Sequence, residues 1–444
     1  MSEIPRRAVT RTARLATLPL GVAGRAAVGL GKRVGGRPAE VVAAELQART
    51  AEQMFSVLGE LKGGAMKFGQ ALSVLEAAMP EDLAGPYRAT LTKLQDAAPP
   101  MAAQRVHDIL AEELGPRWRT AKFRSFEDAP AAAASIGQVH RAVWRDGRDV
   151  AVKIQYPGAA EALVNDLAQI SRMARIMGVW IPGLDVKPIA AELTARMTEE
   201  LDYDLEARNQ RAFHRAYRGV DDVVVPDVLS HSEHVIVSEW VEGTPLSTII
   251  ADGSEQERDL ASELYLEFLV DAPERVRMLH ADPHPGNFRI TPDGRLGVLD
   301  FGAVNRLPHG LPPALGELLS FALAGDAAQV AEGLATEGFI NARRPVQPEA
   351  LLAYLNPFID PLRRGEFTFS RPWMRSVAAH VRDPRKPEFL VGLSLNLPPD
   401  YVLIHRVWLG GIGVLCQLGG TVPGRDIILG ALPGVIPDIL PAPQ

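Results

Sequence analysis

The chain has 444 residues, of which 47% are hydrophobic, enough to bury a large core and to divide into more than one domain. Its one cysteine, Cys416, excludes an internal disulfide, and no apolar stretch near the start predicts a secretory signal, so we expect a cytoplasmic protein. The formal net charge of -7 argues against a general nucleic-acid-binding protein.

The first 40 residues form a basic leader. Up to residue 37 it carries a single acid, Glu3, and leucines and valines are interspersed among the basic residues. Such a segment is typical either of a stretch that lies on an anionic membrane surface, which would make the protein peripherally membrane-associated, or of a solvated tail. The basic residues are Arg6, Arg7, Arg11, Arg14, Arg25, Lys32, Arg33 and Arg37.

After the leader, the pattern changes from helical to strand periodicity. Apolar residues recur at helical spacing to about residue 114, which predicts an N-terminal helical extension over residues 41–122. From Phe123 the pattern alternates, and "QVHRAVWRDGRDVAVKIQ" predicts two strands joined by a two-residue turn, Asp146 and Gly147. Helical spacing returns over residues 159–217, and "VVVPDVL" and "HVIVSEWV" predict short strands.

Beyond residue 245 the sequence is mostly helical. The exception is "LHADPHPGNFRITPDGRLGVLDFGAV", in which "NFRI" and "LGVLD" predict strands that flank a turn at residues 291–294. Near the end, "VWLGGIGVLCQL" is shorter than the roughly 20 residues that span a membrane, so we expect a core helix or a surface-docking tail. This order predicts an α+β, protein-kinase-like two-lobe fold, with lobes at residues 123–245 and 246–444.

Two polar motifs within residues 279–304 have the spacing of a phosphoryl-transfer site. His280, Asp282 and Asn287 fit H-x-D-x-x-x-x-N, and Asp300 begins a following D-F-G. Transfer of phosphate from ATP needs Mg²⁺ or Mn²⁺, which favour carboxylate and amide oxygens, so Asn287 and Asp300 are the predicted metal ligands. Asp282 is the candidate to accept a proton or orient the attacking group, and His280 is expected to fix the loop through hydrogen bonds.

Two other interpretations of this stretch stay open. His280, Asp282 and His284 alternate like metal ligands, which is compatible with a metallohydrolase. Alternatively, residues 293–302 are a turn and a buried strand whose aspartate caps a neighbouring group. The presence of both motifs at the right separation favours the nucleotide-phosphate site.

A lysine that holds the phosphates is expected on an earlier strand, and Lys153 at the end of "VAVK" has this position. On this strand Val150, Val152 and Ile154 should fill one face, while Ala151 and Lys153 point to the other, where the short alanine leaves room for adenine.

The partner of Lys153 should be a carboxylate from the helix "AELTARMTEELDYDLEARNQRAF". Its acids would repel one another without a base or metal among them, so some should meet Lys153 or the metal. Glu206 is the first choice for Lys153 and Glu200 the competitor. The acids are Glu199, Glu200, Asp202, Asp204 and Glu206.

The segment "AAAASIGQV" lies where a typical kinase has a glycine-rich phosphate loop. Alanine disfavours positive φ and its Cβ holds the backbone away from the phosphates, so only Gly137 offers the usual freedom. The loop should therefore hold the nucleotide differently from that of ordinary kinases. The residues expected around ATP are Ala133, Ala134, Ser135, Ile136, Gly137, Gln138, Val139, Ala151, Lys153, Glu239 and Val241.

Together, "KFGQ" at residues 67–70, "AAAASIGQVHRA", "VAVKIQYPG", "EELDYDLEARN", "HADPHPGNF" and "LDFG" resemble the UbiB/ADCK family, also called the aarF-domain family of atypical kinases. The resemblance runs from about residue 42 to at least residue 306. It implies a protein-kinase-like fold whose N-terminal helical extension packs over the active site. The family's K-x-G-Q motif matches Lys67 and Gln70, which the resemblance places in the site. Its E-x-D motif matches Glu200 and Asp202, which it places near Lys67, and this leaves Glu206 for Lys153.

The same resemblance implies a function. Elements inserted where a peptide would bind favour ATP hydrolysis, or phosphorylation of a small or lipid-like molecule, over protein phosphorylation. Family members support the biosynthesis of isoprenoid quinones, chiefly ubiquinone, and act near membranes. The chain lacks a clear pair of C-terminal transmembrane helices, so membrane contact would be peripheral. It also lacks an A-P-E segment after Gly302, so control by activation-loop phosphorylation is not expected.

Two alternatives belong to other classes. A small-molecule phosphotransferase of the aminoglycoside or choline kinase type has a similar H-x-D-x-x-x-x-N loop, but "KFGQ" and "AAAASIGQ" favour the UbiB/ADCK type. A nucleotide-gated lipid-binding scaffold with little turnover is the other, although all candidate catalytic residues are present. The expected partners are ATP, an isoprenoid or quinone-related lipid and an anionic membrane, without nucleic acid.

Overall fold

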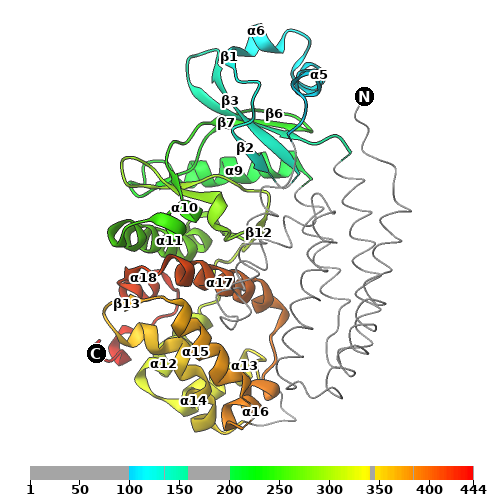
Figure 1. Ribbon diagram of the computed structural model, residues 1–444. Helices are drawn as coiled ribbons and strands as arrows, with labels where there is room; N and C mark the ends of the chain where they lie inside the picture. The colour runs from blue at the N-terminus through cyan, green and yellow to red at the C-terminus, as the bar shows by residue number, and fades with distance from the viewer. Residues whose placement is uncertain (1–99, 135, 159–200, 341–345, 384, 444) are drawn as a thin grey trace, which may run out of the picture.

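The computed structural model describes residues 100–134, 136–158, 201–340, 346–383 and 385–443. In this part of the chain a β-sheet lies at one end, helices fill the other end, and helix α9 (Tyr203–Tyr217) lies between them (Figure 1). The mixture of helices and sheets confirms the α+β class. The basic leader, most of the predicted extension and the predicted helices at 159–200 lie outside the described residues, as do Lys67, Gln70, Ser135 and Glu200.

The largest sheet has six antiparallel strands in the order β1-β3-β4-β7-β6, with β2 paired to β3. Val150, Val152 and Ile154 of β4 are buried in a core shared with helices α5 (Ala103–Leu114) and α6 (Trp118–Lys122). Ala151 and Lys153 face a cavity on the other side, so the predicted alternation is confirmed. The strands are β1 (Phe123–Phe126), β2 (Ala132–Ala134), β3 (Gly137–Trp144), β4 (Asp149–Gln155), β6 (Val228–His231) and β7 (Val235–Glu239).

Strands β3 and β4 form the predicted hairpin, but the prediction of a two-residue turn is wrong. The Trp144 N–H donates to the Arg148 carbonyl at 2.8 Å, so residues 145–147 form a three-residue loop. Gly147 has a φ of 106°, which favours glycine and lets such a loop follow the twist of the strands.

Two small sheets follow between the large sheet and the helices. The predicted strands "NFRI" and "LGVLD" correspond to β10 (Phe288–Ile290) and β11 (Leu296–Val298), which pair antiparallel. They lie in a sheet of order β5-β11-β10-β8, with β5 at Val223–Val224 and β8 at Thr244–Pro245. A second pair joins β9 (Met278–His280) to β12 (Val304–Arg306).

The helical end is built around α11 (Glu255–Val276), whose first turn is fixed by a capping box between Ser254 and Glu257. Tyr265 and Phe268 of this helix are buried in a core with Val414 and Leu415 of α17 (Pro399–Leu418). The remaining helices are α10 (Leu246–Asp252), α12 (Ala314–Ala324), α13 (Ala327–Thr336), α14 (Pro348–Ile359), α15 (Arg371–Arg382), α16 (Pro387–Ser394) and α18 (Gly424–Ala431), and a last strand pair is β13 (Phe367–Thr368) with β14 (Thr421–Val422).

Helix α17 corrects the prediction made for "VWLGGIGVLCQL". The helix begins eight residues earlier than that stretch, at Pro399, and its 20 residues are long and apolar enough to cross a membrane, the one such helix in the described part of the chain. However, 56% of its most apolar window is buried inside the protein. This burial agrees with the predicted core helix.

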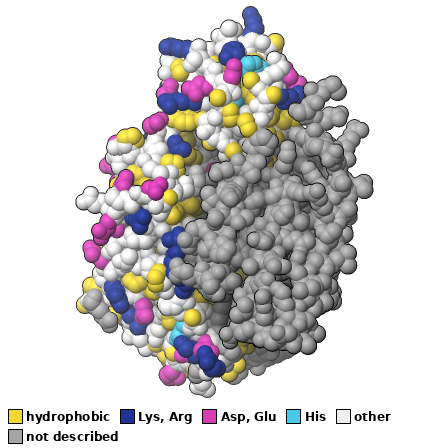
Figure 2. All heavy atoms as spheres, in the orientation of Figure 1, with side chains coloured by type: hydrophobic (Ala, Val, Ile, Leu, Met, Phe, Trp, Pro, Cys, Tyr) yellow, Lys and Arg dark blue, Asp and Glu magenta, His cyan; other side chains and the backbone are white. Residues whose placement is uncertain are grey.

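The surface of the described part carries both signs of charge. Figure 2 shows acidic and basic side chains interspersed over the face in view, without a patch of one sign.

His140 on β3 is buried in a defined protonation state. The Gln138 side chain accepts from the Met101 N–H at 2.8 Å through Oε1, so its Nε2 is the donor to His140 Nε2, at 2.7 Å. His140 Nδ1 then carries the ring proton and donates to the Glu127 carbonyl at 2.8 Å. Both side chains are almost fully buried, so a second ring proton would meet another N–H.

This arrangement predicts a loss of stability in acid. Burial lowers the pKa of His140 below its ordinary value of 6.5, although the Glu127 carbonyl and Asp128 oppose the shift. The unfolded chain therefore binds the proton more readily, and stability is lost as the pH falls below that value. We expect a lower urea midpoint at pH of about 5.5 than at about 7.5, with a smaller difference for His140→Gln, which cannot be protonated. An equal difference in the two proteins would contradict this assignment.

Candidate active site

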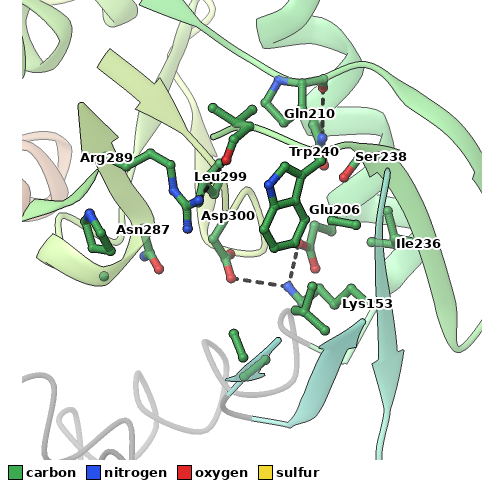
Figure 3. A pocket seen from close by; sticks show the side chains of 18 of the residues that line it. Lys153, Glu206, Gln210, Ile236, Ser238, Trp240, Asn287, Arg289, Leu299 and Asp300 are labelled. Carbon is green, nitrogen blue, oxygen red and sulfur yellow. Dashed lines mark hydrogen bonds and ion pairs between the residues drawn. The ribbon is translucent and has the colours of Figure 1, made fainter. Parts of the chain in front are cut away.

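A cavity of about 500 Å³ lies between the six-stranded sheet and the β10–β11 hairpin. This volume is typical of small-molecule and cofactor sites. The side chains labelled in Figure 3 converge on it from β4, from α9, from β7 and the residue after it, and from the β10–β11 hairpin with its flanking residues. The lining residues are Ala132, Ala133, Ala134, Val139, Ala151, Lys153, Glu206, Gln210, Pro226, Ile236, Ser238, Glu239, Trp240, Val241, Pro245, Ser247, His284, Gly286, Asn287, Arg289, Leu299 and Asp300.

Lys153 lies between two carboxylates in this cavity (Figure 3). Its Nζ donates to Glu206 Oε1 at 2.6 Å and to Asp300 Oδ2 at 3.2 Å. Burial disfavours the charged amine, but Asp300, Glu206 and Tyr203 hold the pKa of Lys153 well above its ordinary value. The structure thus brings together Lys153 and Glu206, the first of the two candidate partners.

Helix α9 positions Glu206. Asp202 caps the helix, because its side chain accepts from the Leu205 N–H at 2.8 Å. Glu206 follows in the first turn, where the helix dipole favours a carboxylate, and its side chain is 3% exposed. Asp202 is itself exposed and does not line the cavity.

Backbone pairing holds the two polar motifs side by side. The Ala281 N–H donates to the Ala303 carbonyl at 2.9 Å beside the β9–β12 pair, and the Leu299 N–H donates to the Asn287 carbonyl at 2.9 Å beyond β11. The hydrogen bond expected from His280 is present, between its Nε2 and the Asp300 carbonyl, at 2.6 Å. Phe301 is fully buried, and its ring centroid lies 5.6 Å from that of His280.

Asn287 and Asp300 offer oxygen atoms to the same cavity (Figure 3). The Asn287 Nδ2 donates to the Asp282 carbonyl at 3.2 Å, which leaves the amide oxygen as the acceptor of that side chain. Asp300 Oδ1 accepts from the Gly302 N–H at 3.0 Å, which fixes the carboxylate. An amide and a carboxylate oxygen fit a hard divalent cation such as Mg²⁺.

The described residues contain no group of three or more His, Cys, Asp and Glu side chains that could hold a metal by itself. His280, Asp282 and His284 therefore do not form the metallohydrolase site that their spacing allows. A cation bound by Asn287 and Asp300 would need further oxygen ligands, as phosphate groups supply.

Asp282 is half-buried at the start of the loop and does not line the cavity. Its neighbour Pro283 accepts a hydrogen bond from the Tyr265 hydroxyl through the carbonyl, at 2.8 Å. Burial, with the charge of Asp282, raises the pKa of Tyr265 well above its ordinary value. The carboxylate thus lies close enough to Tyr265 for its charge to act on the phenol.

Three residues expected around the nucleotide lie elsewhere. Ile136 packs in a core with Tyr203 and Ile236. Gln138 accepts from the Met101 N–H on the opposite face of the sheet, because side chains alternate along β3. Gly137 does not adopt positive φ. A Cβ at this position would collide with the Ile154 carbonyl oxygen of β4, so the glycine permits close strand approach.

The alanines of the predicted phosphate loop belong to β2. Ala133 and Ala134 pair with Gln138 and Gly137 of β3, and both line the cavity. Extended backbone accommodates alanine, whereas glycine would loosen this edge. We expect the double variant Ala133→Gly, Ala134→Gly to differ several-fold in ATP affinity from the unaltered protein, as measured by calorimetric titration. Titration curves that coincide with those of the unaltered protein would argue against a role for the alanines.

Several lining residues were missed in the sequence. Gln210 lies one turn after Glu206, and its Nε2 donates to the Pro226 carbonyl at 2.9 Å. Its position four residues after Glu206 places it on the same helix face, which could have predicted that it lines the cavity. Trp240 could also have been found, because it lies between Glu239 and Val241, which were predicted to line the site. For Arg289 and Leu299, no local sequence pattern indicates a position in the cavity.

Comparison with known proteins agrees with these motifs. The family model of the ABC1 atypical kinase-like domain matches residues 93–334, which include Lys153, Glu206, Asn287 and Asp300. The chain is 29% identical over 356 residues to Atypical kinase coq-8, mitochondrial, of Caenorhabditis elegans, covering 76% of this chain and 46% of that protein. It is 30% identical over 336 residues to Atypical kinase COQ8B, mitochondrial, of Danio rerio, covering 74% and 53%.

The chain thus spans about half the length of these curated relatives. A solved structure, that of the Rv3197-erythromycin complex from Mycobacterium tuberculosis, superposes with a TM-score of 0.69. Its sequence is 42% identical, and the match covers 90% of this chain and 99% of that chain. The chain therefore belongs to the ABC1 atypical kinase-like family, the UbiB/ADCK family that its motifs resemble.

Proposed function

We propose that this protein is an atypical kinase or ATPase that binds ATP with Mg²⁺ or Mn²⁺ and supports isoprenoid quinone or other lipid metabolism. It does so by ATP hydrolysis or by phosphorylating a small or lipid-like molecule. The observation that carries the proposal is the position of Lys153 between Glu206 and Asp300, in a cavity that Asn287 also lines. The names of the mitochondrial relatives, atypical kinases, support it.

Each residue has a distinct part in this proposal. Lys153 meets the phosphates and Glu206 keeps it in place. Asn287 and Asp300 hold the cation, which neutralises charge on the phosphate oxygens when bound. Asp282 orients the attacking hydroxyl or water or accepts its proton.

The proposal includes the parts of the chain that lie outside the described residues. The sheet of residues 123–245 and the helices of residues 246–444 act as two lobes around the cavity. Of the predicted extension, residues 41–99 pack over the cavity, whereas α5 and α6 lie on the opposite face of the sheet. From that extension, Lys67 and Gln70 enter the site and meet Glu200 and Asp202. This assignment follows the family motifs.

Incubation of purified protein with ATP, Mg²⁺ and anionic vesicles tests the activity. Release of phosphate supports an ATPase. Transfer of labelled phosphate from ATP to a small molecule or lipid of an added cell extract supports a kinase. Tight ATP binding without release would instead favour a nucleotide-gated scaffold. Phosphorylation of a soluble amino alcohol or amino sugar would favour the phosphotransferase of the aminoglycoside or choline kinase type.

A second candidate function is the binding of a macrolide. The observation that favours it is the 42% identity to Rv3197 of Mycobacterium tuberculosis, which is described in complex with erythromycin. Titration of erythromycin into the protein, with and without ATP, tests this candidate. If erythromycin gave no heat of binding and did not change the affinity for ATP, macrolide binding would be ruled out.

We further propose that the protein is cytoplasmic and contacts anionic membranes through its basic leader. Deletion of residues 1–37 should lower the fraction that cosediments with vesicles containing anionic lipid, because most of the leader's charges are basic. Neutral vesicles provide the control. An unchanged cosedimented fraction would remove this role from the leader.

A further inference from the structure

Arg289 enters the cavity from the strand that follows Asn287 (Figure 3). Its Nη1 donates to the Val241 carbonyl at 2.7 Å. Of the residues that the structure describes around the cavity, Lys153 and Arg289 are the only lysine or arginine side chains. They have different neighbours, because Lys153 contacts Glu206 and Asp300, whereas Arg289 contacts Val241 in the segment after β7.

The hairpin is built to admit this side chain. Gly297 pairs with Arg289 across β10 and β11. A Cβ at residue 297 would lie 2.9 Å from Val241 Cγ1 and 3.1 Å from Arg289 Cγ. The missing side chain therefore leaves the space through which Arg289 passes to Val241.

Part of the guanidinium has no acceptor in the described part of the protein. Its Nε is buried and has no hydrogen-bond partner among the described residues. Burial also lowers the pKa of Arg289, against the charge of Glu242. A buried donor without an acceptor costs free energy, and an aromatic face next to the guanidinium would stabilise this end of the site.

The cavity that Arg289 enters has apolar walls, which suit a flat ring better than a phosphate. Val139 and Ala151 line the cavity from the sheet, and Val241, Pro245 and Leu299 line it as well. Such apolar walls bind a planar base, while phosphates need the charge and metal ligands near Lys153.

We infer that Arg289 binds the base of the nucleotide, by stacking and hydrogen bonding, and takes no part in holding the phosphates. This inference rests on the proposed function, because it assigns a residue within the same nucleotide site. Lys153 then binds the phosphates of the nucleotide and Arg289 binds its base.

Calorimetric titrations with ADP, adenosine and tripolyphosphate test this division. Arg289→Met should weaken ADP and adenosine by a similar factor, roughly tenfold, and leave tripolyphosphate unchanged. Lys153→Met should weaken ADP and tripolyphosphate and leave adenosine unchanged. Arg289→Lys, which keeps the charge but lacks the flat guanidinium, should lose most of the base affinity.

The matched control is Arg295→Met on the same hairpin, since Arg295 is half-exposed, pairs with Asp293 at 2.7 Å and does not line this cavity. It should bind all three probes normally. Equal weakening of ADP and tripolyphosphate by Arg289→Met would overturn the inference, as would unchanged affinities. Failure of the unaltered protein to bind any probe would overturn the proposed function with it.

Discussion

Replacement of Asp300 by asparagine should reduce Mg²⁺-dependent phosphate release from ATP by roughly 10²- to 10³-fold. The substitution removes the charge that would bind the cation and that lies 3.2 Å from Lys153. It keeps the side-chain oxygen that accepts from the Gly302 N–H, so the D-F-G turn should be retained. Rates at saturating ATP, measured over a range of Mg²⁺ concentrations, check the prediction.

Asp293→Asn provides the matched control for this experiment. Asp293 lies on the same hairpin, is exposed, and pairs with Arg295 and Thr291 away from the cavity. Its replacement should leave phosphate release unchanged. If Asp300→Asn retained the rate of the unaltered protein, the assignment of the metal site would be wrong.

The second large effect is expected on stability. Glu206→Ala removes the closer partner of Lys153 in a pair whose side chains are 17% and 3% exposed. Asp300 stays as the more distant partner of Lys153, so we expect the loss to lie at the lower end for breaking a buried pair, about 3 kcal/mol of unfolding free energy. Lys153→Met combined with Glu206→Leu should recover most of this loss, because both charges of the more buried pair are then absent and Asp300, 30% exposed, is partly hydrated. Urea unfolding of the three proteins measures both quantities.

Two further variants make this stability result specific. Asp149→Ala breaks an exposed pair with Arg141, at 3.0 Å, and should cost less than about 1 kcal/mol. Lys153→Ala should weaken ATP binding, because it removes the charge that meets the phosphates, and unchanged affinity would refute that role. A small cost for Glu206→Ala, similar to that for Asp149→Ala, would show that the buried pair contributes little.

Much of the fold follows from local patterns in the sequence. Alternation in "VAVKIQ" predicts which side chains of β4 face the cavity, and the D-G dipeptide marks the β3–β4 hairpin. The loop length was wrong because Arg145 also lies outside the ladder. The length of α17 was wrong because a helix can continue through polar residues, such as His405, on its less buried side.

The cavity was harder to predict, since it depends on contacts between distant segments. The contact of Arg289 with Val241 requires the pairing of β10 with both β8 and β11, which no local pattern encodes. Gln138 was assigned to the cavity because the direction of alternation in β3 was unknown. Motifs with a fixed spacing, such as Asn287 and Asp300, need less tertiary information because one hairpin joins them.

The hydrogen bond between Lys153 and Asp300 connects the large sheet to the hairpin that bears the metal-site residues. In the proposed function, an incoming phosphate would take the place of this carboxylate at the ammonium. One anion would thus be exchanged for another at the ammonium. Nucleotide binding would then include the breaking of this hydrogen bond, which would contribute to the rate of nucleotide uptake.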